Sequence, residues 1–178
     1  MSKMSREELV QHLTPPPGIT MPPYPAKRDK IYRLSLILLG IGVAAEGISG
    51  IAGLVGAQFW IQGGISVVLI VSGWTFLVWL KQWRWTVRMM VVLGFILWPF
   101  WPLGAWALSL AASAIMAAKE THCFHFWAGR VIPWYTLALG VFFIAHLSQP
   151  YLGIVWLGLA ALWISLAAGR SKLPLFEV

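Results

Sequence analysis

Long apolar stretches alternate with short polar segments along most of this chain. Six stretches between residues 31 and 168 are apolar enough to predict helices in lipid, where about 20 apolar residues cross the hydrocarbon core. The predicted spans cover residues 31–55, 59–80, 86–98, 105–118, 132–147 and 151–168. The pattern therefore predicts an all-α fold, a polytopic membrane bundle of six transmembrane helices.

The basic residues predict how these spans are threaded. They gather before the first span and after the second, fourth and sixth, in clusters at Lys27, Arg28, Lys30 and Arg33; Lys81, Arg84 and Arg88; Lys119 and Arg130; and Arg170 and Lys172. Positive charge in short loops stays on the cytoplasmic side of a membrane. A single topology places all of these clusters on that side. It consists of three successive hairpins with both termini cytoplasmic.

Residues 86–118 admit two interpretations. As one helix they would be about 50 Å long at about 1.5 Å per residue, too long for a bilayer crossing. Two prolines, a glycine and two tryptophans lie at the centre of the segment, in Trp98-Pro99-Phe100-Trp101-Pro102-Leu103-Gly104. We interpret this centre as an outer turn between two short spans. The alternative is one long kinked helix, which would move residues 119–130 to the outside.

These spans divide the chain into three parts. Residues 1–30 are predicted to form a cytoplasmic, proline-rich tail, residues 31–169 the transmembrane domain, and residues 170–178 a short cytoplasmic tail. The first tail is either a tether or a strap that docks along a neighbouring subunit. Residues 81–85 and 119–130 are predicted as inner loops.

Composition narrows the function classes. The chain is 59% hydrophobic and 11% charged, whereas soluble domains carry about 25% charged residues. Its net charge of +7 lies beside apolar spans, so anionic lipid headgroups are expected partners and nucleic acid is not. The single cysteine excludes an internal disulfide. No nucleophile–histidine–acid set or pair of carboxylates at catalytic spacing is visible, so the sequence does not favour an enzyme.

Glu46 is the only carboxylate well inside a predicted span. A charge at that depth is costly, which makes the residue a functional candidate. Glu46 follows Ile31 by as many residues as His146 follows Val131, and the first and fifth spans run in the same direction. The two residues are therefore predicted to lie at similar depth in the membrane. They could meet as a proton-linked pair, or His146 could ligate the magnesium of a chlorophyll or the iron of a haem. The alternative is a buried polar pair, or a protonated acid, with a purely structural role.

The predicted inner loop carries His122, Cys123 and His125 close to Glu120. Metal binding is conceivable, but the set lacks a second cysteine cluster. We interpret the segment as interfacial, with its aromatic side chains in the headgroups and its histidines in water. His125 is retained as a candidate cofactor-binding residue.

Small residues predict where the spans pack closely. Gly47, Gly50, Gly53 and Gly56 recur at every third position in the outer half of the first span. In lipid, such a stripe allows a neighbouring backbone to approach and favours helix association.

Short motifs carry a resemblance to a known family. They are Lys119-Glu120 followed by Cys123-Phe124, then Pro133 and Ala145-His146-Leu147, and, around the start of the first span, Asp29-Lys30-Ile31-Tyr32-Arg33-Leu34-Ser35-Leu36. On these residues the chain resembles the uncharacterised integral membrane proteins common in cyanobacteria and some plastids, over about residues 29–172. Ala145 stands where that family has glycine. The family's function is not established. The resemblance implies a photosynthetic (thylakoid or cytoplasmic) membrane, pigment–protein complexes as neighbours, and Glu120, Cys123 and His146 as positions of interest.

Three hypotheses of function follow. The first is a non-catalytic accessory or assembly subunit of a photosynthetic membrane complex, such as a photosystem, in which His146 could hold chlorophyll or another tetrapyrrole. The second is a small proton-coupled transporter or channel that uses Glu46. The third is an enzyme acting on a lipid or isoprenoid, with His122 and His125 as acid–base groups.

Overall fold

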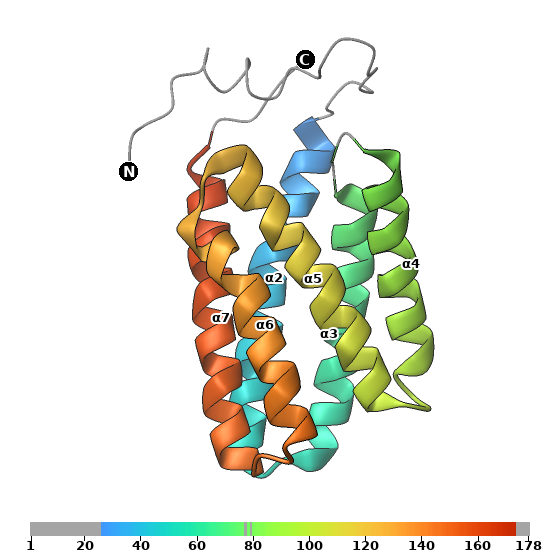
Figure 1. The fold of residues 1–178 in the computed structure, drawn as a ribbon, viewed down its shortest axis with the longest axis vertical. Coiled ribbons are helices and arrows are strands. Elements are labelled where there is room, and N and C mark those ends of the chain that lie inside the picture. Colours follow the sequence, from blue (N-terminus) through green and yellow to red (C-terminus); the bar gives the residue numbers. More distant parts are fainter. Residues whose placement is uncertain (1–25, 77, 79, 174–178) are drawn as a thin grey trace.

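The computed structural model describes residues 26–76, 78 and 80–173, and this part of the chain is a bundle of antiparallel helices (Figure 1). The helices are α2 (Ala26–Ile51), α3 (Val55–Thr75), α4 (Lys81–Leu97), α5 (Pro102–Phe124), α6 (Trp127–Ile144) and α7 (Gln149–Ser171). Five of them are long and apolar enough to cross a membrane. The sixth, α4, has 17 residues, at the lower limit of length for a crossing. The predicted all-α, multi-pass membrane bundle is confirmed.

The segment from residue 86 to 118 is a hairpin, as predicted. Helix α4 ends at Leu97, and α5 begins at Pro102. Proline is well tolerated at the first position of a helix, because its missing N–H would have no partner within the helix there. The indole of Trp98 in the turn donates a 2.8 Å hydrogen bond to the carbonyl oxygen of Phe59. This bond joins the α4–α5 turn to α3. The alternative of one long kinked helix is wrong.

Several helix ends differ from the ends of the predicted spans and loops, because polar residues extend the helices. Helix α2 begins at Ala26, inside the predicted tail, and residues 81–85 form the start of α4. The predicted loop 119–130 shrinks to residues 125 and 126, because α5 continues to Phe124. Lysine, arginine and glutamate are good helix formers, and a charged composition does not end a helix when its charges reach water or a partner. The predicted tails at residues 1–25 and 174–178 lie outside the described residues.

The predicted close packing along the glycine stripe is confirmed at Gly47 and Gly50. A Cβ added to Gly47 would lie 2.8 Å from the carbonyl oxygen of Gly153, and Gly50 also faces α7 closely. Gly53 instead takes a positive φ of 69° in the α2–α3 turn, and Gly56 faces open space. The close approach of α2 and α7 therefore depends on glycine at one crossing point.

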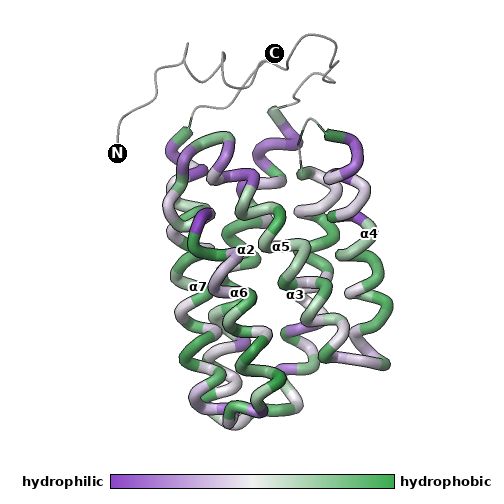
Figure 2. The backbone as a smooth tube through the Cα atoms, in the orientation of Figure 1, coloured by the Kyte–Doolittle hydropathy of each residue, from purple (hydrophilic) through white to green (hydrophobic). Residues whose placement is uncertain are grey.

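The basic residues gather at one end of the bundle, within the strongly hydrophilic region at the top of Figure 2. Every described lysine and arginine lies there, where α2 begins and α7 ends, and we call it the basic end. At the opposite end Glu46 is the only charged side chain among the described residues. The grouping of basic residues at one end is confirmed. That this end faces the cytoplasm stays a prediction from the charge rule.

Candidate functional site

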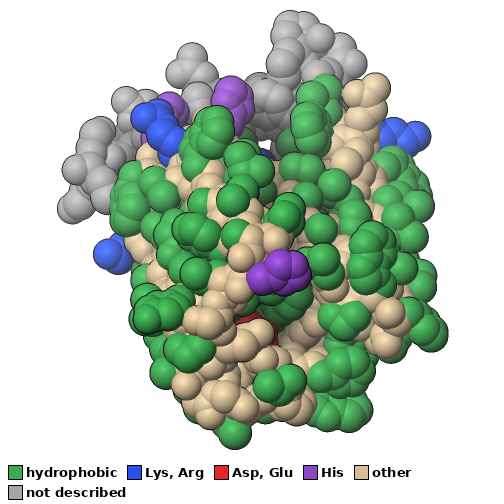
Figure 3. All heavy atoms as spheres, turned by 60° about the horizontal axis from the view of Figure 1, so that its bottom comes forward, with side chains coloured by type: hydrophobic (Ala, Val, Ile, Leu, Met, Phe, Trp, Pro, Cys, Tyr) green, Lys and Arg blue, Asp and Glu red, His purple; other side chains and the backbone are tan. Residues whose placement is uncertain are grey.

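Two polar sites occupy the two ends of the bundle. The first is a cavity of about 360 Å³ at the end opposite the basic one, and we call it the Glu46 pocket. Five helices line it, through Glu46, Val55, Gln58, Phe59, Gln62, Pro102, Leu103, Trp106, Phe143, Gln149, Leu152 and Trp156. Figure 3 shows this end hollowed, with an acidic side chain visible inside the hollow. Of the lining residues only Glu46 is acidic.

Glu46 is the most unusual group in the pocket. It sits on α2 next to Gly47, so the close approach of α7 encloses it, and only 3% of the residue is exposed. Gln58 lines the same pocket as the carboxyl group. The Oε2 atom of Glu46 is buried and has no hydrogen-bond partner among the described residues. A buried carboxyl oxygen without a partner is costly, so another molecule bound in the pocket would stabilise it.

Three glutamines connect the helices around the pocket. The amide nitrogen of Gln58 donates a 3.3 Å hydrogen bond to the side-chain oxygen of Gln149, which joins α3 to α7. Gln62 donates a 2.9 Å hydrogen bond to the carbonyl oxygen of Pro102, which joins α3 to α5. The pocket thus combines one carboxyl group with neutral amides.

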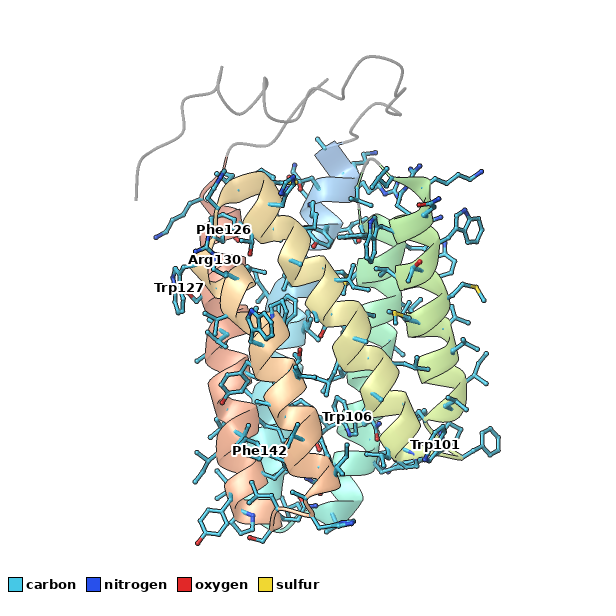
Figure 4. All side chains as sticks on the ribbon, in the orientation of Figure 1. Trp101, Trp106, Phe126, Trp127, Arg130 and Phe142 are labelled. Carbon is cyan, nitrogen blue, oxygen red and sulfur yellow. The ribbon has the colours of Figure 1, made fainter. Side chains whose placement is uncertain are left out.

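Aromatic rings form the wall of the pocket. The rings of Trp106 and Trp156 lie 4.5 Å apart between centroids, and Phe143 meets Trp156 edge to face at 5.9 Å. Trp106 projects from α5 into the bundle, whereas Trp101 lies at the α4–α5 turn (Figure 4). Trp156 is 1% exposed. These rings line the same pocket as the single carboxyl group.

An apolar plug separates the pocket from the basic end. Trp156, Trp163, Leu39 and Leu69 pack here, around a second cavity of only about 10 Å³. A cavity of that size is at the lower limit for one water molecule. This small cavity lies directly beside the Glu46 pocket, because Trp106 and Trp156 line both of them.

The second site is a buried charge cluster at the basic end, formed by Asp29, Arg33, Lys119, Glu120 and Arg170. Asp29 accepts a 2.8 Å hydrogen bond from Nε of Arg33 and another of 2.8 Å from Nη2 of Arg170. Glu120 accepts a 2.7 Å hydrogen bond from Nζ of Lys119. Its other oxygen lies 3.7 Å from Nε of Arg170. Arg170 therefore joins the two carboxylates, and the cluster holds α2, α5 and α7 together.

Aromatic rings shield the charge cluster from lipid and water. The guanidinium of Arg170 lies 4.1 Å from the ring centroid of Phe124. The ammonium of Lys119 lies 5.2 Å from that of Tyr32. Both carboxylate side chains are fully buried. Buried charges persist when each has an opposite charge and hydrogen bonds, which is the arrangement here.

Sequence reasoning missed this cluster, because it assigned Lys119 and Glu120 to a loop. Two signals pointed toward it. Asp29 and Arg33 stand four residues apart, the spacing of an ion pair on one helix face. The motifs at the start of the first span and at Lys119–Phe124 also supply most of the cluster and its aromatic shield.

The structure separates the three predicted cofactor-binding residues. Glu46 lies in the pocket, but α6 ends at Ile144, and His146 is exposed in the following turn with a φ of 53°. It does not line the pocket. The predicted Glu46–His146 encounter is therefore wrong for this conformation. His125 caps α5 at the basic end with a φ of 54°. Within the described residues, no three histidine, cysteine, aspartate or glutamate side chains form a group that could hold a metal ion.

No protein-family model, curated protein or solved structure matches the chain. Its class, a multi-pass helical membrane protein, is defined by the length and hydropathy of its helices. The resemblance to cyanobacterial and plastid membrane proteins stays a prediction.

Proposed function

We propose that the protein is a non-catalytic accessory or assembly subunit of a membrane complex, and that it binds a small ligand or a partner's side chain in the Glu46 pocket. The single observation that carries the binding role is the Oε2 atom of Glu46, which is buried and unpartnered at the wall of a cavity. A group of this kind is stable when another molecule supplies the missing hydrogen bond. Lipid contacts the apolar outer faces of the helices.

The chemistry of the two sites supports binding over catalysis. The pocket offers one carboxyl group and three amides, and amides do not exchange protons as acids or bases near neutral pH. The charged side chains of the cluster at the basic end form ion pairs with one another. This cluster therefore serves to hold helices together, whereas the pocket serves recognition.

The proposed setting is a photosynthetic membrane with photosystem subunits as partners, and the sequence resemblance supports it. In that setting His146, exposed at the α6–α7 turn, would be the ligand of a chlorophyll or another tetrapyrrole. A visible absorption spectrum of the gently solubilised protein tests this part. Absorption bands that disappear in His146→Asn would support a bound pigment, and a colourless parent protein would exclude it.

Co-purification in mild detergent tests the accessory role. Affinity-purified parent protein is expected to bring partner subunits with it in defined proportion. Isolation as a single species, without partner subunits and without an extractable small molecule, would contradict the proposal.

A proton-coupled transporter is the second candidate, because Glu46 is an acid buried within a membrane helix. Transport would require the plug around Trp156 and Trp163 to open toward the basic end. Flux into proteoliposomes that is abolished in Glu46→Gln would favour this function. Absence of flux in the parent protein would remove it.

A further inference from the structure

We infer that the ligand of the Glu46 pocket is a small organic ammonium ion with an apolar body. The inference rests on the proposed binding function and specifies the chemical class of ligand. Three features of the pocket carry it: its charge, its aromatic wall and its size.

The charge of the pocket selects cations. Glu46 is the only charged residue that lines it. The nearest basic residue on the same helix, Arg33, is thirteen positions away, which is about 20 Å along an α-helix. A buried carboxylate with one unpartnered oxygen is stabilised by an opposite charge, which offsets its lost hydration. An anion would be repelled, and a neutral molecule would offset less of that cost.

The aromatic wall selects an organic cation. Ring faces attract cations electrostatically, and tryptophan does so most strongly. Trp106 and Trp156 form a tilted ring pair in the wall, and the ring of Phe143 meets that of Trp156 edge to face. An ammonium group placed between these rings and Oε2 of Glu46 would contact the rings and donate a hydrogen bond to the carboxylate. Its apolar body would pack on the remaining ring surface.

The size of the pocket favours an organic ion over a bare metal ion. A volume of about 360 Å³ lies at the small end of the range of about 300–1,000 Å³ found for ligand sites. The part of the chain that the structure describes contains no group of three or more acidic, histidine or cysteine side chains suited to a metal ion. An ion with one ring or a short chain would fill the space.

A charge series of probes tests the inference on the full chain in detergent. Phenethylammonium, 2-phenylethanol and 3-phenylpropionate have similar size but carry positive, zero and negative charge. Binding is measured by isothermal titration calorimetry. Phenethylammonium is expected to bind about tenfold or more tightly than the alcohol, and 3-phenylpropionate most weakly, because only the cation pairs with the carboxylate.

Variants connect this preference to Glu46. Glu46→Gln keeps the shape of the side chain and is expected to remove the preference for the cation while leaving affinity for the alcohol nearly unchanged. Glu46→Asp retains the charge and should keep the preference, so the test does not depend on one variant folding. Ser148→Ala is the control, because Ser148 is exposed at the same end and does not line the pocket. It should bind all three probes like the parent.

The possible failures are distinct. Equal binding of the cation and the alcohol, in both parent and Glu46→Gln, would overturn the ammonium inference while leaving a ligand-binding pocket. Competitive displacement of phenethylammonium by millimolar sodium would also overturn it, in favour of an inorganic cation. Binding of none of the three probes to folded parent protein would overturn the inference together with the binding part of the proposed function.

Discussion

Asp29 is expected to be the residue on which the basic end of the bundle depends most. It is fully buried, and its two carboxylate oxygens accept hydrogen bonds from Arg33 on its own helix and from Arg170 on α7. Asp29→Asn keeps the shape of the side chain but removes its charge. Two buried guanidinium groups would then face each other across a neutral amide.

The size of the effect follows from these contacts. Removing one partner of a buried ion pair costs about 3–5 kcal/mol, because it leaves an uncompensated buried charge. Asp29 balances two such charges, so we expect the upper part of this range, about 4–5 kcal/mol, to be lost from the free energy of unfolding. Arg170→Met should cost less, about 3 kcal/mol, because Asp29 keeps Arg33 and Glu120 keeps Lys119.

A double-mutant cycle provides the assay. Unfolding is followed by tryptophan fluorescence during denaturant titration in detergent, for the parent, both single variants and the double variant. Because the double variant no longer buries an unmatched arginine at position 170, its loss should be smaller than the sum of the single losses by about 2 kcal/mol. Arg130→Met is the control for loss of an exposed arginine at the same end, with an expected change of about 0.5 kcal/mol or less. Additive losses, or a loss in Asp29→Asn no larger than that in Arg130→Met, would refute the structural role of the cluster.

Two further predictions concern packing and threading. Gly153→Ala should destabilise the bundle by about 1–3 kcal/mol, because its Cβ would lie 2.6 Å from a carbonyl oxygen of α2. The matched control is Gly64→Ala, whose Cβ meets open space and which should be neutral or slightly stabilising. Equal effects of the two substitutions would contradict the close α2–α7 contact. The threading is tested with the single substitutions Ser148→Cys and Lys172→Cys in a Cys123→Ser background. These two positions lie at opposite ends of the bundle, so they should react with a membrane-impermeant thiol reagent from opposite sides of the membrane. Labelling of both from one side of sealed vesicles would show that the bundle does not span the bilayer.

The sequence was sufficient for features that depend on local chemistry. Helices in lipid must satisfy their own backbone hydrogen bonds, so a long apolar stretch already implies a helix. The prolines and tryptophans at residues 98–104 marked the α4–α5 turn for the same local reason, since proline lacks the N–H that an interior helical position requires. The spacing of basic clusters likewise predicted that they share one end, which the structure confirms.

Helix ends were harder to predict, because they depend on tertiary partners. Lys119 and Glu120 are charged residues between two apolar spans, which suggested a loop, yet they belong to α5. Their burial is compensated by their own ion pair and by contacts with Arg170 and Tyr32. The pattern of charge along the chain does not contain that compensation. It exists only once α2, α5 and α7 are packed.

By itself, the sequence predicted the fold class and the depth of Glu46, because hydropathy and helical rise act along a single segment. It favoured a hairpin at residues 86–118 over one long helix, and the structure decided between the two. Only the tertiary structure decided which groups share a site. Depth along a helix says nothing about its rotation or its neighbours, so equal depth did not bring His146 to Glu46. Close contact between α2 and α7 at their glycines instead enclosed the carboxyl group beside three glutamines and an aromatic wall that lie far apart in the sequence.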